Sequence, residues 1–276
     1  MQLGVQQLES RLHPVVVFAK PADALVARGD FYDGIVKIMD SVGGIGTGGL
    51  IWRGVGQGFG HHIITAAHAT PLNSPAFTTF ELTRNGADVD IIIETPGGPG
   101  YQFRDPAWKC SEQPYDVGLI KIVDQDKMTQ APTRLMVAPF KAQQYEFQPG
   151  GLVVDQSIAK FAGYGRTGTG ITGEMPGTAG VKRRGSNVLD QVDGPDFLYD
   201  FDNGTDDKNR MGNKGLGPDI EAVQVGGDSG SPIFIQVKIA GVLWPTSQVQ
   251  GSARGRLGDV AFETRASVVL ICTVVQ

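Results

Sequence analysis

Cysteine is scarce in this chain, with only Cys110 and Cys272 among its 276 residues. Small secreted domains that depend on disulfides carry several pairs of cysteines, so a disulfide framework is excluded as the basis of the fold. A single long-range bridge between the two cysteines remains open. Packing of apolar side chains must therefore supply most of the stability.

Long apolar runs and an excess of basic charge are also missing. No segment reaches the roughly 18 consecutive apolar residues of a membrane-spanning helix, and the N-terminus lacks the charged-then-apolar layout of a signal peptide. The 24 Lys and Arg residues are outnumbered by 29 Asp and Glu, which gives a net charge of −5. The sequence therefore predicts a soluble protein with no membrane span and no nucleic-acid partner.

Glycine and short apolar segments, by contrast, are abundant. The chain has 39 glycines and 16 prolines, and its apolar runs, such as "VDIIIE", "DVGLIKIV" and "SPIFIQV", have the length of single strands. Turn pairs such as Asn85-Gly86 stand between the runs. This pattern predicts an all-β chain built as a mostly antiparallel sandwich or barrel.

The apolar runs divide the chain into three parts. Residues 1–30 lack sustained periodicity and are interpreted as an N-terminal arm or propeptide remnant. Residues 31–140 and 141–276 each hold a set of predicted strands, with a Pro-containing connector between them. The stretch from about 166 to 225 is rich in Gly, Thr, Asn and Asp and predicts long surface loops, in which Lys182, Arg183 and Arg184 form an exposed basic cluster.

The strongest local signal is the segment "GGDSGSP", residues 226–232, in which a serine stands between glycines and beside an acid. Acyl transfer needs an exposed hydroxyl and backbone N–H groups that face the oxygen on which negative charge develops. Neighbours without a Cβ let the backbone and the substrate approach closely. Ser229 is therefore the candidate nucleophile, and the amides of Gly227 and Ser229 are the candidate oxyanion donors.

Two further segments supply partners for a nucleophilic serine. In "HHIITAAHAT" a buried strand and two small alanines precede His68, which places the imidazole at the rim of a sheet. In "YDVGLIKI" the carboxylate of Asp116 stands at the start of an apolar strand, where it can accept a hydrogen bond from an imidazole nitrogen.

The segments "TAAH", "DVGLIKI" and "GDSGSP", in the order His, Asp, Ser, resemble the trypsin and chymotrypsin-like serine peptidases. The resemblance covers roughly residues 31 to 270, and "GYGRTGTGITG" with "KRRGSNVLD" is similar to bacterial members. It implies two six-stranded antiparallel Greek-key β-barrels with the active site in the cleft between them. It also implies a secreted, monomeric endopeptidase that acts on protein or peptide substrates and needs no cofactor.

The same resemblance implies roles for single residues. Ser229 attacks the scissile carbonyl, His68 takes and returns the proton, and Asp116 fixes the imidazole tautomer. The amides of Gly227 and Ser229 hold the oxyanion. Val223 and Trp244 occupy substrate-binding positions.

The chain departs from the family pattern at several places. Val223 stands where trypsin-like enzymes carry the carboxylate that selects Lys or Arg, so a preference for apolar or small residues is expected. The string "SVGGIG" at 41–46 lies too close to His68 to act as a freed activation terminus. Asp228 must therefore have another partner, either a backbone donor or a basic side chain.

Two alternatives accompany this interpretation. The acidic segment from Asp200 to Asp207 has the oxygen ligands of a structural Ca²⁺ site but lacks the full loop signature, and no His or Cys group has metal-ligand spacing. The protein could also keep the fold as a catalytically silent binding or regulatory protein.

Overall fold

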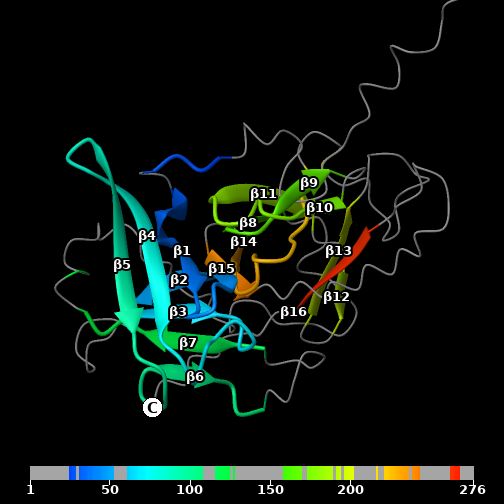
Figure 1. Ribbon diagram of the computed structural model, residues 1–276. Coiled ribbons are helices and arrows are strands. Elements are labelled where there is room, and N and C mark those ends of the chain that lie inside the picture. Colours follow the sequence, from blue (N-terminus) through cyan, green and yellow to red (C-terminus); the bar gives the residue numbers. More distant parts are fainter. Residues whose placement is uncertain are drawn as a thin grey trace, which may run out of the picture.

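The computed structural model describes residues 25–28, 31–52, 61–107, 116–124, 127, 158–169, 173–188, 191–193, 196–201, 216, 221–235, 238–242 and 262–267. Almost all regular structure in these ranges is β-strand, with one short 3-10 helix, η2 (Phe31–Gly34). Figure 1 shows the strands in two groups, one from each half of the chain. The all-β prediction is confirmed.

The first half forms one antiparallel sheet in the order β5-β4-β1-β2-β3-β7-β6. Its strands are β1 (Ile35–Met39), β2 (Ile45–Trp52), β3 (His61–Thr65), β4 (Ala76–Arg84), β5 (Ala87–Thr95), β6 (Gln102–Arg104) and β7 (Gly118–Lys121). The sheet has seven strands rather than the expected six, because the three-residue β6 pairs with β7 at its outer edge.

This sheet curls around its own core. The hydroxyl of Thr95 on β5 donates a hydrogen bond to the carbonyl of Lys121 on β7, 3.3 Å away, although the two strands stand far apart in the sheet order. On β5 the burial alternates, so that Ile91 and Ile93 face inward while Ile92 is 50% exposed. The alternation comes from the strand backbone, since the three consecutive isoleucines are equally apolar and Ile92 still faces outward.

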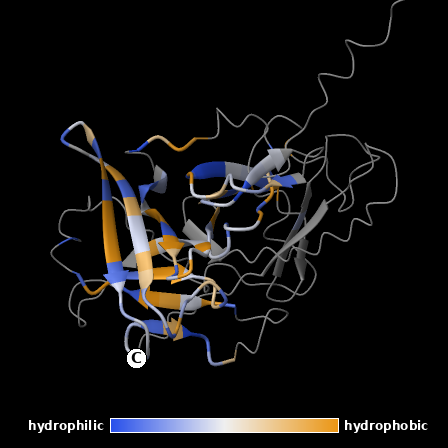
Figure 2. Ribbon diagram, in the orientation of Figure 1, coloured by the Kyte–Doolittle hydropathy of each residue, from blue (hydrophilic) through white to orange (hydrophobic). Residues whose placement is uncertain are grey.

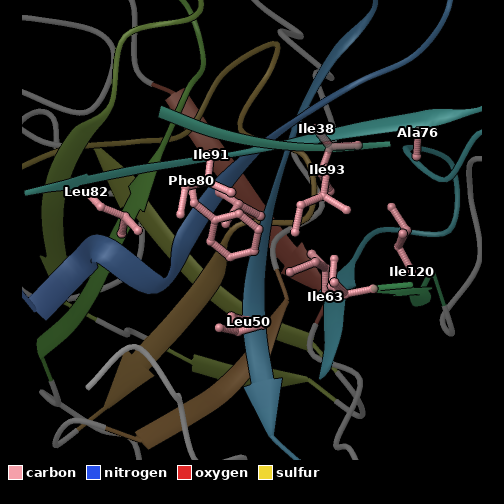
Figure 3. Packing of buried hydrophobic residues seen from close by; sticks show 11 residues of the cluster. Ile38, Leu50, Ile63, Ala76, Phe80, Leu82, Ile91, Ile93 and Ile120 are labelled. Carbon is pink, nitrogen blue, oxygen red and sulfur yellow. The ribbon is translucent and has the colours of Figure 1, made fainter. Parts of the chain in front are cut away.

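The core inside the curled sheet is made of aliphatic side chains around one aromatic ring. Its members come from β1, β2, β3, β4, β5, β7 and adjoining residues: Val36, Ile38, Leu50, Ile63, Ala76, Phe80, Leu82, Ile91, Ile93, Ile120 and Ile122. Figure 3 shows Leu82 and Ile91 beside the Phe80 ring and the other labelled side chains between the strands, and Figure 2 shows hydrophobic residues on strands such as β5 and β7.

The second half forms three smaller antiparallel sheets. A four-stranded sheet has the order β11-β8-β14-β15, a three-stranded sheet has the order β12-β13-β16, and β9 pairs with β10. Their bounds are β8 (Ile158–Gly163), β9 (Thr167–Thr169), β10 (Gly173–Met175), β11 (Arg183–Val188), β12 (Gln191–Asp193), β13 (Asp196–Phe201), β14 (Pro232–Ile235), β15 (Lys238–Val242) and β16 (Phe262–Ser267). The expectation of long surface loops from 166 to 225 is thus wrong where β9 to β13 lie. The proposed boundary near residue 140 lies outside the described residues.

The two halves pack against each other through a second apolar cluster. Tyr32 and Ile64 from the first half meet Tyr164 and Phe234 from the second, and the rings of Tyr32 and Phe234 pack edge to face with centroids 6.0 Å apart. Residues 25–28 also touch both halves, since Leu25 pairs with Arg183 and the Arg28 guanidinium lies 2.7 Å from the Asp90 carboxylate.

The predicted exposed basic cluster is corrected by the structure. Lys182 is only 4% exposed, and its Nζ donates to the carbonyl of Tyr32 at 3.4 Å and lies 5.6 Å from the centre of the Tyr164 ring. Burial lowers the pKa of Lys182, opposed by the charges of Glu81 and Asp33. Arg183 is half-buried, and only Arg184 is exposed.

No helix among the described residues is long and apolar enough to cross a membrane.

Truncation of Phe80 tests how much the aromatic ring in the core contributes to the stability of the fold. Phe80→Ala is expected to lower the free energy of unfolding by about 3–5 kcal/mol, because Phe80 is fully buried and leaves a cavity. Ile92 on the neighbouring strand β5 is 50% exposed, so Ile92→Ala should lower the free energy of unfolding by less than about 1 kcal/mol. Equal losses in urea denaturation would contradict the assignment of Phe80 to the centre of the core.

Candidate active site

His68 lies in a tight turn directly after β3. The turn is closed by hydrogen bonds from the amide of Ala69 to the carbonyl of Ala66 (3.1 Å) and from the amide of Thr70 to the carbonyl of Ala67 (3.1 Å). The hydroxyl of Thr70 also donates to the carbonyl of Ala66, at 2.9 Å. Ala66 and Ala67 are fully buried, whereas the imidazole side chain of His68 is 33% exposed. The turn therefore holds the backbone rigidly while the ring reaches the surface.

Asp116 stands two residues before β7, which pairs with β3, and its side chain is 2% exposed. One carboxylate oxygen, Oδ1, accepts a hydrogen bond from the backbone N–H of His68 at 2.8 Å. The other, Oδ2, lies 2.5 Å from Nδ1 of the imidazole. With the Nδ1 proton facing the carboxylate, Nε2 is left as the ring's acceptor. The structure thus brings together the two residues that the sequence predicts as partners.

The serine loop is a compact turn between Val225 and Ser231. The amide of Asp228 donates to the carbonyl of Val225, and the amide of Ser231 donates to the carbonyl of Asp228, each at 2.9 Å. Gly227 has φ = +102° and Gly230 has φ = +86°, backbone conformations that side-chain-bearing residues rarely adopt. The glycines that surround Ser229 are therefore required by the shape of the loop itself.

The serine loop is fixed to the first half of the chain by Thr47 on β2. The amide of Thr47 donates to the carbonyl of Ser229 at 2.8 Å, and its hydroxyl donates to the carbonyl of Gly227 at 2.9 Å. A Cβ on Gly230 would lie 2.7 Å from the backbone nitrogen of Ala66, at the start of the histidine turn. Ser229 and His68, which come from different halves of the chain, thus lie on adjoining loops.

Asp228 belongs to the serine loop, and its side chain is buried. The sequence predicts a backbone donor or a basic side chain as its partner. Its carboxylate accepts hydrogen bonds from the backbone N–H groups of Gly165 (2.7 Å) and Val225 (3.1 Å). Burial raises the pKa of Asp228 to about 7, while these two hydrogen bonds and the charge of Arg183 lower it. Backbone donors and a nearby guanidinium thus take the place of a freed N-terminus.

Arg104 is a residue near the site that the sequence analysis missed. On β6 it stands opposite Gly118, and its guanidinium donates to the carbonyl of Thr70 at the end of the histidine turn. Burial lowers the pKa of Arg104, and attraction to Asp116 opposes that shift. No sequence motif marks such a residue, because its role arises only from the pairing of β6 with β7.

The substrate-binding predictions are only partly covered by the described residues. Val223 is 4% exposed and is followed by Gln224, whose side-chain oxygen accepts a hydrogen bond from the hydroxyl of the buried Tyr199. The segment Val223–Val225 therefore carries no charged side chain. Trp244 lies outside the described residues.

Two other predictions fall wholly or largely outside those residues as well. Cys110 and Cys272 are both beyond the described ranges, so a bridge between them remains open. Asp200 lies on β13, but the rest of the candidate calcium loop up to Asp207 is not described apart from Phe201.

Comparison with known proteins places the fold. No family model and no curated protein matches the chain. Among solved structures, a mutant of human heparin-binding protein (CAP37) is 13% identical, with a TM-score of 0.53 over 90% of this chain and 91% of that chain. Human heparin-binding protein is 14% identical, with a TM-score of 0.49 over 90% and 92%.

Together with the strand topology, the first of these likenesses shows that the chain has the chymotrypsin-like β-barrel fold. Identity this low shows the fold alone. The first neighbour is a human protein, so it lends no support to the bacterial subgroup suggested by the sequence.

The buried carboxylate of Asp228 predicts a pH-dependent stability. Its folded-state pKa of about 7 lies above the ordinary 3.8, so the folded protein binds this proton more tightly than the unfolded chain. The resulting stabilisation is fully present below about pH 3.8 and is lost as the pH rises through about 7. The free energy of unfolding of the wild type, measured relative to Asp228→Asn in urea, should therefore fall between pH 4 and 8. A difference that stays constant with pH would contradict this prediction.

Proposed function

We propose that this protein is a serine endopeptidase that hydrolyses peptide bonds through an acyl-enzyme intermediate. The observation that carries the proposal is the double contact of Asp116 with His68, at 2.8 Å to the backbone nitrogen and 2.5 Å to Nδ1. Such a pair presents Nε2 as a base at the surface, and the loop with Ser229 adjoins the same turn.

In the proposed acylation step, Ser229 Oγ attacks the carbonyl carbon of the scissile bond while His68 Nε2 takes the hydroxyl proton. Negative charge develops on the substrate carbonyl oxygen, which the amides of Gly227 and Ser229 stabilise. The tetrahedral intermediate collapses, the C–N bond breaks, and the imidazolium returns the proton to the leaving amine. Asp116 remains ionised throughout and stabilises the imidazolium.

Deacylation repeats these steps with water. His68 Nε2 takes a proton from the water as its oxygen attacks the ester carbonyl. The C–O bond to Ser229 then breaks, and the proton passes from His68 to Ser229 Oγ. The products are a free carboxylic acid and the regenerated enzyme, so no external reductant, oxidant or cofactor enters the balance.

The proposed substrates are proteins or peptides with an apolar or small residue before the scissile bond. The uncharged segment Val223–Val225 supports this preference over Lys or Arg. We also propose that the protein acts outside the cytoplasm and that it is a monomer.

The alternative is a binding protein in which the same fold persists without turnover. The first structural neighbour is a heparin-binding protein, and heparin is a polyanion. Heparin binding is not favoured for this chain, because its net charge is −5 and Lys182 of its basic triplet is buried.

Covalent labelling separates the enzyme from the silent protein. A fluorophosphonate probe should label the folded wild type with one equivalent, and labelling should be lost in Ser229→Ala, which keeps the fold. His68→Ala should reduce the labelling rate by at least about a hundredfold, because the hydroxyl loses its base. Absence of labelling in a wild type shown to be folded by circular dichroism would favour the binding protein.

Substrate preference is tested by cleavage of a peptide library. Cleavage after apolar or small residues is expected, since no carboxylate stands at position 223 to bind a basic side chain. Dominant cleavage after Lys or Arg would contradict the predicted role of Val223.

A further inference from the structure

Three consecutive peptide groups of the serine loop are held from outside the loop. The N–H of Gly226 donates to the carboxylate of Glu174 at 3.2 Å, and the carbonyl of Gly226 accepts a hydrogen bond from the backbone N–H of Arg166 at 3.0 Å. The carbonyl of Gly227 accepts from the hydroxyl of Thr47 at 2.9 Å. Two of these three contacts therefore come from the segment that forms β9 and β10.

The carboxylate of Glu174 is itself held in place. One guanidinium nitrogen of Arg166, Nη1, lies 3.2 Å from Glu174 Oε2, while the other carboxylate oxygen, Oε1, faces Gly226. Arg166 thus bonds to Gly226 through its backbone and to Glu174 through its side chain, which closes a ring of three residues. Antiparallel pairing of Glu174 with Gly168 joins the strands that carry this ring.

Solvation of this ion pair argues against a mainly structural purpose. The side chain of Arg166 is 47% exposed and that of Glu174 is 29% exposed. Ion pairs this close to water are screened and contribute little to folding. Glu174 reaches the serine loop through the hydrogen bond from Gly226, and its charge also acts on the Asp228 carboxylate.

The held peptide group has a direct consequence for the proposed oxyanion site. In a trans peptide the C=O and the following N–H point in opposite directions. The carbonyl of Gly226 and the N–H of Gly227 belong to the same peptide, so fixing that carbonyl on Arg166 fixes the direction of the Gly227 N–H. Rotation of this peptide would turn the donor away from the oxyanion.

We propose that Glu174, paired with Arg166, is a positioning residue that sets the orientation of the Gly227 N–H for transition-state stabilisation. The proposal rests on the proposed function. Glu174 does not touch the substrate. It acts through Gly226: Glu174 fixes the peptide group before the Gly226 Cα, while the Arg166 backbone N–H fixes the peptide group after it, which carries the Gly227 N–H. The effect of Glu174 belongs to the step in which the oxyanion forms.

The activity test compares two substitutions at one position. Glu174→Ala removes the acceptor of the Gly226 N–H and should lower kcat by about ten- to a hundredfold with KM within about twofold of wild type. This loss is smaller than the roughly 10²–10³-fold loss caused by removing an oxyanion donor outright. Glu174→Gln keeps an acceptor oxygen for Gly226 and should restore most of kcat. Asp124→Ala, which breaks the comparably exposed Asp124–Lys127 pair, should leave both constants unchanged.

Amide hydrogen exchange gives a measurement that does not need turnover. Exchange of the peptide spanning residues 223–230 should be faster in Glu174→Ala than in wild type, and close to wild type in Glu174→Gln. Unchanged exchange in Glu174→Ala would overturn the proposal, whether or not the protein is an enzyme. If the probe labels wild type, faster exchange in Glu174→Ala together with an unchanged kcat of that variant would also overturn the proposal.

The two proposals can fail separately. If the fluorophosphonate probe does not label wild type, the peptidase proposal fails and the positioning role in catalysis fails with it, whatever the exchange result. If wild type is labelled, a loss of kcat in both Glu174→Ala and Glu174→Gln would overturn the positioning role alone, because Gln retains the bond to Gly226.

Discussion

Thr47 is the residue through which the two halves of the chain are connected at the candidate site. It is fully buried, and all of its polar groups are used. Its amide and hydroxyl donate to the serine loop, the hydroxyl oxygen accepts the amide of Tyr164 at 3.1 Å, and its carbonyl accepts the hydroxyl of Thr65 at 2.7 Å. Because Thr65 ends β3 and leads into the histidine turn, Thr47 links the loop that carries Ser229 directly to the strand that positions His68. Each of its bonds is shielded from water, where a broken hydrogen bond is not replaced.

The parts of the site that sequence could predict are those determined by local pattern. The short apolar run "VDIIIE" indicates the strand β5, and the glycines around Ser229 indicate a loop with close backbone contacts, in which Gly227 and Gly230 have positive φ. The pairing of His68 with Asp116 needed more than local pattern, but the resemblance of both segments to a known family supplied it. Ser229, Gly227 and the oxyanion role remain proposals, although the loop that carries them has the expected shape.

Sequence could not predict contacts that depend on which strands become neighbours. Arg104 reaches Thr70 only because β6 pairs with β7, and Asp228 receives the amide of Gly165 from a strand end 63 residues away. Lys182 was interpreted as exposed because its neighbours are Arg183 and Arg184. In the fold its ammonium is enclosed by the Tyr164 ring and a backbone carbonyl, which are partners distant in sequence. Composition indicates how polar a segment is, whereas burial depends on what packs over it.

The location of the basic triplet also bears on how the protein withstands peptidases. Lys182 to Arg184 would be the most obvious cleavage point for enzymes that cut after basic residues. A peptide bond is cut only when its segment can leave its own fold and extend into a foreign cleft. Here Arg183 to Val188 are paired residue by residue with β8, and Lys182 is fixed beneath Tyr164. Cleavage would require β11 to detach from its sheet, so the folded protein conceals this cleavage point.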